Sequence, residues 1–244
     1  MKSIIITGAS SGIGRATAEV FLEQGWTVGL IARRGDRLLE MAHRNKNAMP
    51  LPVDVTDANA MKAAFDRFVA RTGRLDALFN NAGVFGPLGL IDEIDVDDFD
   101  HVLNVNVRGM FLAAQLAFAQ MRTQKPRGGR IINNGSLSSH SPRANSICYT
   151  TSKHAVTGLT RSLSLDGRAF DIACGQIDIG NAGTELVEDL NARALAENPE
   201  AELLPMMDVQ DAARLVLHMA ELPAEANVQF MTVMASKMPY IGRG

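Results

Sequence analysis

Four polar residues in the central part of the chain have types and spacings suited to moving a proton. Tyr149 and Lys153, in Tyr-Thr-Thr-Ser-Lys, are four positions apart. On a helix, this spacing places the phenol and the ammonium on one face. A free phenol has a pKa of about 10 and is a poor base at neutral pH, and a neighbouring ammonium lowers that pKa. We therefore expect Tyr149 to act as a general acid or base, although a surface pair has the same spacing.

The two companions of this pair are Ser136 and Asn106. Ser136 precedes Tyr149 by 13 residues (149 − 136) and follows a predicted strand at 130–133. Because strand ends open onto the ligand crevice of a doubly wound sheet, Ser136 is placed to hydrogen-bond a carbonyl oxygen beside Tyr149. Asn106 lies in an apolar helix pattern, where an amide is costly without partners. It is either part of the site or a satisfied structural residue.

A glycine-rich turn follows the first predicted strand and opens a helix. The turn contains Gly8, Ser10, Ser11, Gly12, Ile13 and Gly14. Glycines permit a sharp turn, close approach of the backbone to a pyrophosphate, and close helix–strand packing. The helix N-terminus directs N–H groups and a positive dipole end at phosphates. An ordinary turn can have this composition, but its place after the first strand favours a nucleotide site.

The end of the second predicted strand indicates which nucleotide is bound. It reads Ile31-Ala32-Arg33-Arg34, and no acid follows until Asp36. An acid here would hold the ribose 2′-hydroxyl of NAD, whereas Arg33 suits a 2′-phosphate. We expect NADP(H), with NAD(H) as the alternative if the arginines are only solvated.

Strands and helices alternate along the chain. The predicted strands are 3–7, 27–31, 51–53, 77–80, 130–133, 172–177 and 229–234. The predicted helices are 13–24, 36–46, 57–71, 97–122, 149–167 and 209–220. This order predicts an α/β fold of Rossmann type, a doubly wound, seven-stranded parallel sheet with helices on both faces. No linker or repeat interrupts it, so we expect one catalytic domain over 1–244.

The helix at 97–122 is apolar on nearly every face between Val102 and Ala119. A helix of this kind is normally buried on all sides. One side would face the sheet and the other a second subunit, which predicts a homodimer or homotetramer. The alternative is that loops of the same chain cover it.

Composition excludes several classes of function. The net charge is −3 and the pI about 6.0, which favours neither nucleic acid nor a membrane surface as partner. No apolar run reaches the roughly 18 residues that span a bilayer, and the N-terminus lacks a signal-peptide core. Cys148 and Cys174 suggest neither a disulfide framework nor a metal site. We expect a cytoplasmic protein without metal.

Taken together, the motifs resemble the short-chain dehydrogenase/reductase family in its compact-subunit branch. They are TGASSGIG at 7–14, NNAG at 80–83, Asn106, Ser136 and YTTSK at 149–153, in the family's order from Ser3 to at least Thr184. The resemblance implies an NADP(H)-dependent oxidoreductase that reduces a carbonyl or oxidises a secondary alcohol of a small molecule. Longer relatives with YxxxK are epimerases or dehydratases, and a non-catalytic cofactor sensor is a further alternative.

The resemblance also implies the catalytic roles. Tyr149 would protonate the carbonyl oxygen, or deprotonate the alcohol in reverse. Lys153 would lower the pKa of Tyr149 and hold the nicotinamide ribose hydroxyls. Ser136 would orient the substrate oxygen, and Asn106 would anchor a water that links Lys153 to solvent.

Further cofactor contacts are implied along the chain. Asp54, with Val55 beside it, corresponds to the contact with the adenine amino group, and Asn81, Ala82 and Gly83 to the lining beside the adenosine. Asn80 would instead stabilise the sheet.

After the sixth strand, Ile179, Gly180 and Thr184 occupy cofactor-contacting positions. Ile179 replaces the family's usual proline, so the rigidity of this loop does not carry over from the resemblance.

Three segments are expected to line an apolar substrate pocket: 84–94, 137–148 and 182–207. The last, which includes Leu186, would form a movable lid. We interpret Arg143 as a solvated loop arginine rather than a ligand for an acidic group. The tail 235–244 either lies across a neighbouring subunit or frays.

Overall fold

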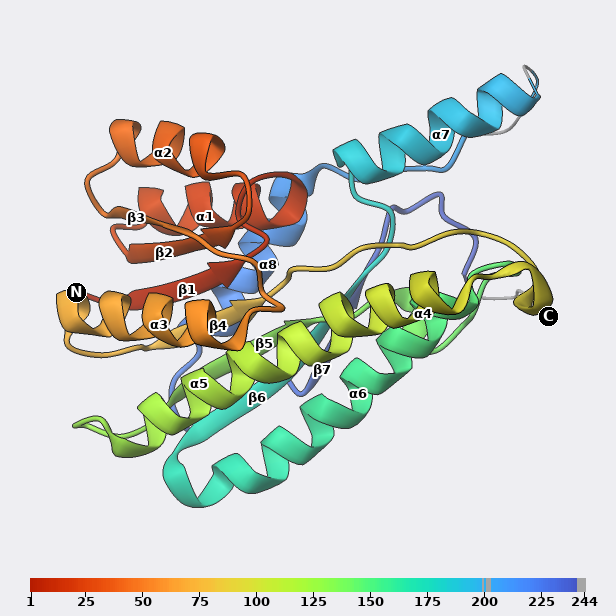
Figure 1. The fold of residues 1–244 in the computed structure, drawn as a ribbon. Coiled ribbons are helices and arrows are strands. Elements are labelled where there is room, and N and C mark those ends of the chain that lie inside the picture. Colours follow the sequence, from red (N-terminus) through yellow and green to blue (C-terminus); the bar gives the residue numbers. More distant parts are fainter. Residues whose placement is uncertain (199, 201–202, 241–244) are drawn as a thin grey trace.

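The chain folds around one seven-stranded parallel sheet with the strand order β3-β2-β1-β4-β5-β6-β7 (Figure 1). The structure is a computed structural model, and it describes residues 1–198, 200 and 203–240. The strands are β1 Ser3–Thr7, β2 Thr27–Ala32, β3 Ala48–Pro52, β4 Ala77–Asn80, β5 Gly129–Asn134, β6 Ile172–Ile179 and β7 Phe230–Val233. The predicted fold class is confirmed. Only β3 departs from its predicted bounds by more than two residues, because it begins at Ala48 rather than 51.

Helices connect the strands. They are α1 Gly12–Glu23, α2 Gly35–Arg44, α3 Ala58–Thr72, α4 Val96–Leu103, α5 Met110–Thr123, α6 Ile147–Gly167, α7 Glu185–Glu197 and α8 Val209–Glu221. Short 3-10 turns cover Ile91–Glu93, Leu137–Ser139 and Arg168–Phe170. Helix α7 was not predicted: it lies in the segment 182–207 expected to form a lid, and it projects from the body of the fold (Figure 1).

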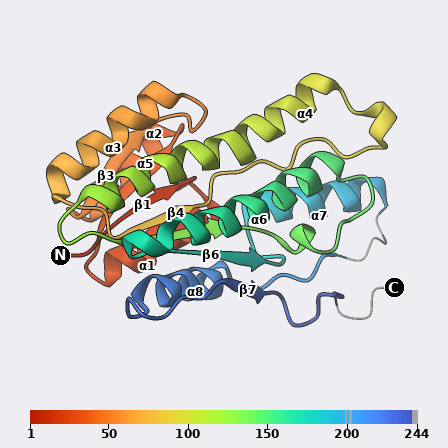
Figure 2. The same ribbon diagram turned by 90° about the horizontal axis from the view of Figure 1, so that it is seen from below.

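The sheet is buried on both faces because apolar residues occupy both sides of its strands. In β1, Ile4 and Ile6 pack with α1, α2 and α8, whereas Ile5 packs with α3 and α5. Figure 2 shows α6 and α8 on opposite sides of β6. Side chains alternate between the faces of a strand, so a continuous apolar run suits a sheet that is covered twice.

The strand order places a crevice at one end of the sheet. β1 pairs with β2 on one side and with β4 on the other, so the chain leaves β1 and β4 in opposite directions. Ligands of doubly wound sheets bind outside the carboxyl ends of the strands at such a point. The glycine turn after β1 and the segments after β4, β5 and β6 therefore meet there.

The helix predicted at 97–122 is continuous but is not one regular helix. Between α4 and α5, residues Asn104–Gly109 form a π-helical stretch, a feature often found at functional sites. Gly109 is needed here, because a Cβ would lie 2.9 Å from Val55 Cγ2.

The outer face of this helix has polar as well as apolar side chains, and it is exposed on this chain. Asn104, Arg108 and Gln115 are exposed there, beside the exposed Phe111. Among the described residues, one helix, Val96–Thr123, is long and apolar enough to cross a membrane, judged by length and composition alone. It packs on the sheet between α3 and α6 as a core helix of the fold.

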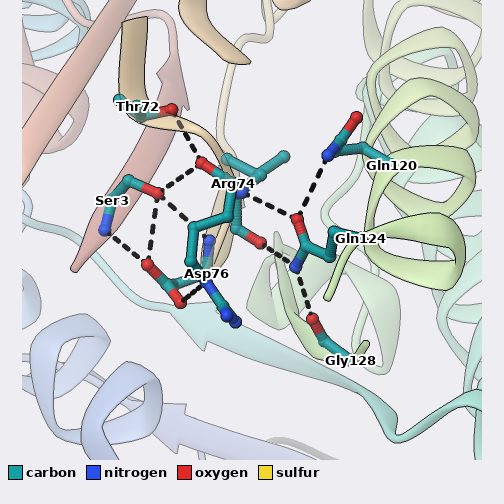
Figure 3. Close-up of polar contacts among 8 residues, drawn as sticks. Ser3, Thr72, Arg74, Asp76, Gln120, Gln124 and Gly128 are labelled. Carbon is teal, nitrogen blue, oxygen red and sulfur yellow. Dashed lines mark hydrogen bonds and ion pairs between the residues drawn. The ribbon is translucent and has the colours of Figure 1, made fainter. Parts of the chain in front are cut away.

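A polar cluster closes the amino end of the sheet, opposite the crevice (Figure 3). Gln124, at the end of α5, accepts a hydrogen bond from the Leu75 N–H and donates to the carbonyl oxygens of Leu75 and Gly128. On β1, the Ser3 N–H donates to Asp76 Oδ2 at 2.8 Å. These bonds tie the starts of β1, β4 and β5 to α5, so the cluster stabilises the scaffold rather than the site.

Candidate active site

The glycine turn after β1 has the backbone geometry that its glycines predict. Gly8 has φ +70° and Gly12 has φ +51°, both in the left-handed region that favours glycine. A Cβ on Gly14 would lie 2.3 Å from the carbonyl oxygen of Gly8. Gly14 therefore lets α1 begin directly against the turn. The Ser11 side chain makes no capping hydrogen bond to α1, so the helix N-terminus faces the crevice uncapped.

Hydrogen bonds join the ends of β1 and β4. Thr7 Oγ1 accepts from the N–H groups of Asn81 (2.9 Å) and Ala82 (3.0 Å). The Asn81 side chain donates to the Thr7 carbonyl oxygen at 3.0 Å and accepts from Asn134 Nδ2 at 2.8 Å. The segment predicted to line the adenosine is thereby held beside the glycine turn.

Lys153 is buried in α6 with 3% of its surface exposed. Its ammonium donates to the carbonyl oxygen of Asn134 at 2.8 Å. Burial lowers the pKa of Lys153 to about 8, and the negative charge of Asp178 opposes this shift. Asn134 was missed in the sequence analysis, although it links Asn81 to Lys153.

Tyr149 lies one turn before Lys153 on the same helix, as predicted. Its ring stacks on Phe85, with centroids 4.1 Å apart and an interplanar angle of 16°. The Lys153 ammonium lies 5.4 Å from the centroid of the Tyr149 ring.

The pKa of Tyr149 is raised rather than lowered, which corrects the expectation. Burial raises the pKa of Tyr149; a hydrogen bond with Ser136 and the charge of Arg143 lower it, and the charge of Asp178 raises it further. Burial prevails, so the phenol remains protonated at neutral pH.

Ser136 is fixed by a buried carboxylate that sequence reasoning did not assign. Its N–H donates to Oδ1 of Asp178 at 2.8 Å, and Asp178 is fully buried. Asp178 also binds Gln176 Nε2 at 2.7 Å and His140 Nε2 at 2.9 Å. A Cβ on Gly135 would lie 2.0 Å from the same Oδ1, which explains the glycine. The available signal was an acid within the apolar run of β6.

Asn106 is fully buried within the π-helical stretch. Its Oδ1 accepts from the Val84 N–H, and its Nδ2 donates to the Val84 carbonyl oxygen, both at 2.8 Å. Nδ2 also donates to Ser152 Oγ at 3.0 Å. These contacts match the structural reading of Asn106: it fastens the segment after β4 to α6, one residue from Lys153.

A cavity of about 530 Å³ runs from the glycine turn to Tyr149 and Lys153. The predicted cofactor residues that line it are Gly8, Ser10, Ser11, Gly12, Ile13, Arg33, Asp54, Val55, Asn81, Ala82, Gly83, Tyr149, Lys153 and Thr184. Gly14 is absent from this wall, and Ile179 and Gly180 line a second, smaller cavity. The glycine turn packs closely against the segment after β6, because a Cβ on Gly12 would lie 3.1 Å from Thr184 Cγ2.

Two arginines face the large cavity beyond β2. Arg33 lines the wall, and its charge helps to lower the pKa of Asp54, after the larger effect of the Thr56 N–H. Arg34, which was not singled out, donates from Nε to Ser10 Oγ at 3.2 Å and from Nη2 to Ser11 Oγ at 2.5 Å.

The second cavity, of about 90 Å³, adjoins the first at Tyr149. Its other lining residues include Phe85, Ser136, Leu137, Arg143, Asn181, Val187 and Met238. The interpretation of Arg143 as a solvated residue is wrong, because its Nη2 donates to Asn181 Oδ1 at 3.1 Å in this wall. The side chain of Leu186 lies outside the described residues.

The C-terminal segment packs against its own chain as far as it is described. Ala235 and Met238 are buried against Leu137 of the same chain, with Tyr240 packed beside them. Residues 241–244 lie outside the described part. Within that part, no three His, Cys, Asp or Glu side chains are grouped to hold a metal ion.

The sheet is doubly wound, and a glycine turn lies at its crevice. Tyr149 lines both cavities there, and Lys153 lines the larger one. This combination is typical of an oxidoreductase that uses a dinucleotide. The chain belongs to the short-chain dehydrogenase/reductase family: the family model described as short chain dehydrogenase matches residues 2–195. It is therefore an enzyme that acts on alcohol or carbonyl groups with a nicotinamide cofactor.

Similar proteins agree with this assignment. A 3beta-hydroxysteroid dehydrogenase of Mediterraneibacter gnavus is 31% identical over 195 residues, which cover 78% of this chain and 70% of that protein. A solved structure of ElxO with NADP bound has a TM-score of 0.86 at 26% identity, covering 96% of this chain and 97% of that one. The 3-ketoacyl-(acyl-carrier-protein) reductase from Brucella melitensis, complexed with NADH, shares the fold with a TM-score of 0.86 at 21% identity and the same coverage.

Proposed function

We propose that this enzyme reduces a carbonyl group, or oxidises a secondary alcohol, with NADP(H) and with Tyr149 as general acid or base. The observation that carries the proposal is the place of Tyr149 in the wall common to the two cavities. The large cavity extends from the glycine turn to Lys153, and the small one contains Ser136 beside Tyr149. A proton donor at this boundary reaches an oxygen in the small cavity.

The residues of the large cavity fit a dinucleotide. Gly8 and Gly12 keep the turn free of side chains, and the uncapped start of α1 supplies N–H groups for phosphates. Asp54 is available for the adenine amino group, and Lys153 for the ribose hydroxyls. When bound, the cofactor supplies or accepts the hydride.

Side chains of the protein donate the proton and stabilise the charge that remains. In the reduction, Tyr149 donates its phenolic proton to the carbonyl oxygen while Ser136 holds that oxygen in place. The raised pKa of Tyr149 keeps the proton on the phenol until the oxygen gains charge. The buried Lys153, held by Asn134, stabilises the phenolate that remains. Asn106 holds Val84 and Ser152 in place beside Lys153. We also propose that Asn106 anchors a water molecule next to that lysine.

The preference for NADP(H) is supported by Arg33 and Arg34. Both line the large cavity where β2 ends, and Asp36 is not part of its wall. Two guanidinium groups favour a 2′-phosphate, whereas a free 2′-hydroxyl is usually held by an acid.

We also infer a homodimer or homotetramer in the cytoplasm. Phe111 on α5 is 49% exposed and Leu165 on α6 is 61% exposed on neighbouring helices, which provides apolar area for a second subunit. Both cysteines are free and buried, which suits a reducing compartment. Sedimentation equilibrium tests the assembly: a stable monomer at micromolar concentration contradicts it.

A substrate panel tests the proposed function. Ketones, aldehydes and secondary alcohols are assayed with NADPH or NADH, and with NADP⁺ or NAD⁺. We expect turnover of at least one carbonyl class, with a higher kcat/KM for NADPH than for NADH. Absence of turnover across the panel, with cofactor binding intact, contradicts the proposal.

A further inference from the structure

The first residue of α7 forms ion pairs with two arginines beyond the end of β2. Glu185 Oε1 accepts a hydrogen bond from Arg37 Nη1 at 2.6 Å, and Glu185 Oε2 lies 3.4 Å from Arg34 Nη1. Arg34 and Glu185 are 151 positions apart in the sequence, and both line the large cavity. A carboxylate is therefore part of the wall that we assign to the cofactor, beside one of its two arginines.

Arg34 connects this carboxylate to the glycine turn. Its Nε donates to Ser10 Oγ at 3.2 Å and its Nη2 to Ser11 Oγ at 2.5 Å, and both serines line the same cavity. Thr184, the residue before α7, lies against Gly12 of this turn. The start of α7, the end of β2 and the glycine turn therefore converge on the Arg34 guanidinium.

The Arg34 guanidinium can bind either a carboxylate or a phosphate. It presents its N–H donors in a planar fork that fits both kinds of oxyanion. The hydroxyl groups of Ser10 and Ser11 can turn to donate to an anion as well. In the structure, the carboxylate of Glu185 lies at the Nη1 side of the fork. A 2′-phosphate bound at Arg34 would use the same donors.

The carboxylate of Glu185 is held in its ionised form. The hydrogen bond from Arg37 is the largest influence on its pKa and lowers it, and the contacts and charges of both arginines outweigh the opposing effect of burial. A phosphate monoester carries close to two negative charges at neutral pH. Because like charges at one site repel each other, Glu185 and a phosphate cannot both bind Arg34 without a cost.

We propose that Glu185 is an internal competitor for the 2′-phosphate of the cofactor: it pairs with Arg34 until the phosphate binds, and the phosphate then takes its place. The shorter contact with Arg37 remains, so the displaced carboxylate keeps a charged partner. This inference rests on the proposed preference for NADP(H) and adds a residue that reduces it. Glu185 is then a specificity-determining residue that weakens the binding of NADP(H) but not of NAD(H).

The binding of two nucleotides tests this exchange without turnover. The probes are adenosine 2′,5′-diphosphate, which carries the 2′-phosphate, and adenosine 5′-monophosphate, which lacks it, titrated by calorimetry at neutral pH and constant ionic strength. The ion pair is exposed, so its removal in Glu185→Gln should tighten binding of the diphosphate by about three- to fivefold. The affinity for the monophosphate should stay within about twofold, because it has no group that displaces Glu185.

Glu188→Gln is the matched control, because it removes the same charge from an exposed glutamate in the first turn of α7. It should bind both nucleotides as the wild type does. In an Arg34→Ser background, the gain from Glu185→Gln should fall below about twofold, since the two residues then no longer interact.

Three results overturn the inference. The first is diphosphate binding that is unchanged or weaker in Glu185→Gln, as a purely structural role in holding α7 predicts. The second is an equal gain for both nucleotides, and the third is an undiminished gain in the Arg34→Ser background.

The inference and the proposed function fail in different ways. If the substrate panel shows turnover with a preference for NADPH but Glu185→Gln does not tighten binding of the diphosphate, the competition is wrong and the reaction type stands. If Glu185→Gln tightens it selectively but nothing in the panel is turned over, the reaction type is contradicted and the competition stands.

Discussion

Asp178 accepts a hydrogen bond from the backbone N–H of Ser136 at 2.8 Å, and the carboxylate is fully buried. A buried charge is costly unless several donors satisfy it. Gln176 and His140 make further hydrogen bonds with this carboxylate. The segment that carries Ser136 is therefore anchored to β6, and its position depends on a residue that is itself fully buried.

Two substitutions separate positioning by Asp178 from its charge. Asp178→Ala leaves the Ser136 N–H without its acceptor, so kcat should fall at least about tenfold with little change in cofactor affinity. Asp178→Asn retains an acceptor but removes the negative charge that raises the pKa of Tyr149. The pH dependence of alcohol oxidation should therefore shift to lower pH. Identical pH profiles for wild type and Asp178→Asn would show that the charge does not act on Tyr149.

The pKa of Lys153 predicts a pH-dependent stability in the protein without cofactor. Its value of about 8 in the folded state lies below the ordinary 10.5. Between these values the unfolded chain binds more protons, so the contribution of Lys153 to stability rises with pH across this interval, by at most about 3 kcal/mol. Below pH 8 both states are protonated, and the contribution is constant.

Denaturant unfolding at pH 8 and pH 10 measures this effect as the difference between wild type and Lys153→Met. The buried Cys174 thiol, with its pKa raised to about 12, acts in the opposite direction but is present in both proteins. We expect the wild type to gain stability relative to Lys153→Met on going to pH 10. A difference that does not change with pH contradicts the burial of a titrating Lys153.

Cofactor preference is predicted to depend on both arginines after β2. Arg33→Asp should increase the ratio of kcat/KM for NADH to that for NADPH by at least about tenfold, because it replaces a phosphate partner with a partner for the ribose hydroxyls. Arg34→Ser should change the ratio in the same direction. Arg44→Gln, on the exposed end of α2, is the control. An unchanged ratio in Arg33→Asp would make that residue a bystander.

Gln124→Leu is expected to destabilise the protein without affecting the site. It removes the side-chain partners of the Leu75 N–H and of the carbonyl oxygens of Leu75 and Gly128. We expect a loss of about 3 kcal/mol, or roughly 6–12 °C in Tm. Gln115→Leu, exposed on the same helix, should change Tm little. Calorimetry with parallel KM measurements checks both, and an unchanged Tm in Gln124→Leu would refute the role of this cluster.

The parts of the molecule that were predictable are those with a local sequence pattern. The glycine turn has a fixed spacing because the backbone requires it, and Tyr149 and Lys153 share a helix face through their separation of four residues. The strands were found because residues such as Ile4, Ile5 and Ile6 are buried on both faces of the sheet.

The unpredicted parts depend on contacts across the sheet. Asn134 acts through its backbone carbonyl and an amide bond to Asn81, which no spacing reveals. Arg143 and Asn181 meet only when the loops after β5 and β6 are folded together. The π-helical stretch around Asn106 has no distinct composition, and burial reverses the pKa shift that the Tyr–Lys spacing alone suggested for Tyr149.

Turnover by Tyr149→Phe is the most direct test of the central claim. The phenylalanine ring preserves the stacking on Phe85, so the fold and the affinity for NADPH should remain within about threefold of the wild type, as checked by titration. Without the phenolic proton, kcat for carbonyl reduction should fall by about 10²–10⁴-fold. Turnover within threefold of the wild type would show that Tyr149 does not deliver the proton.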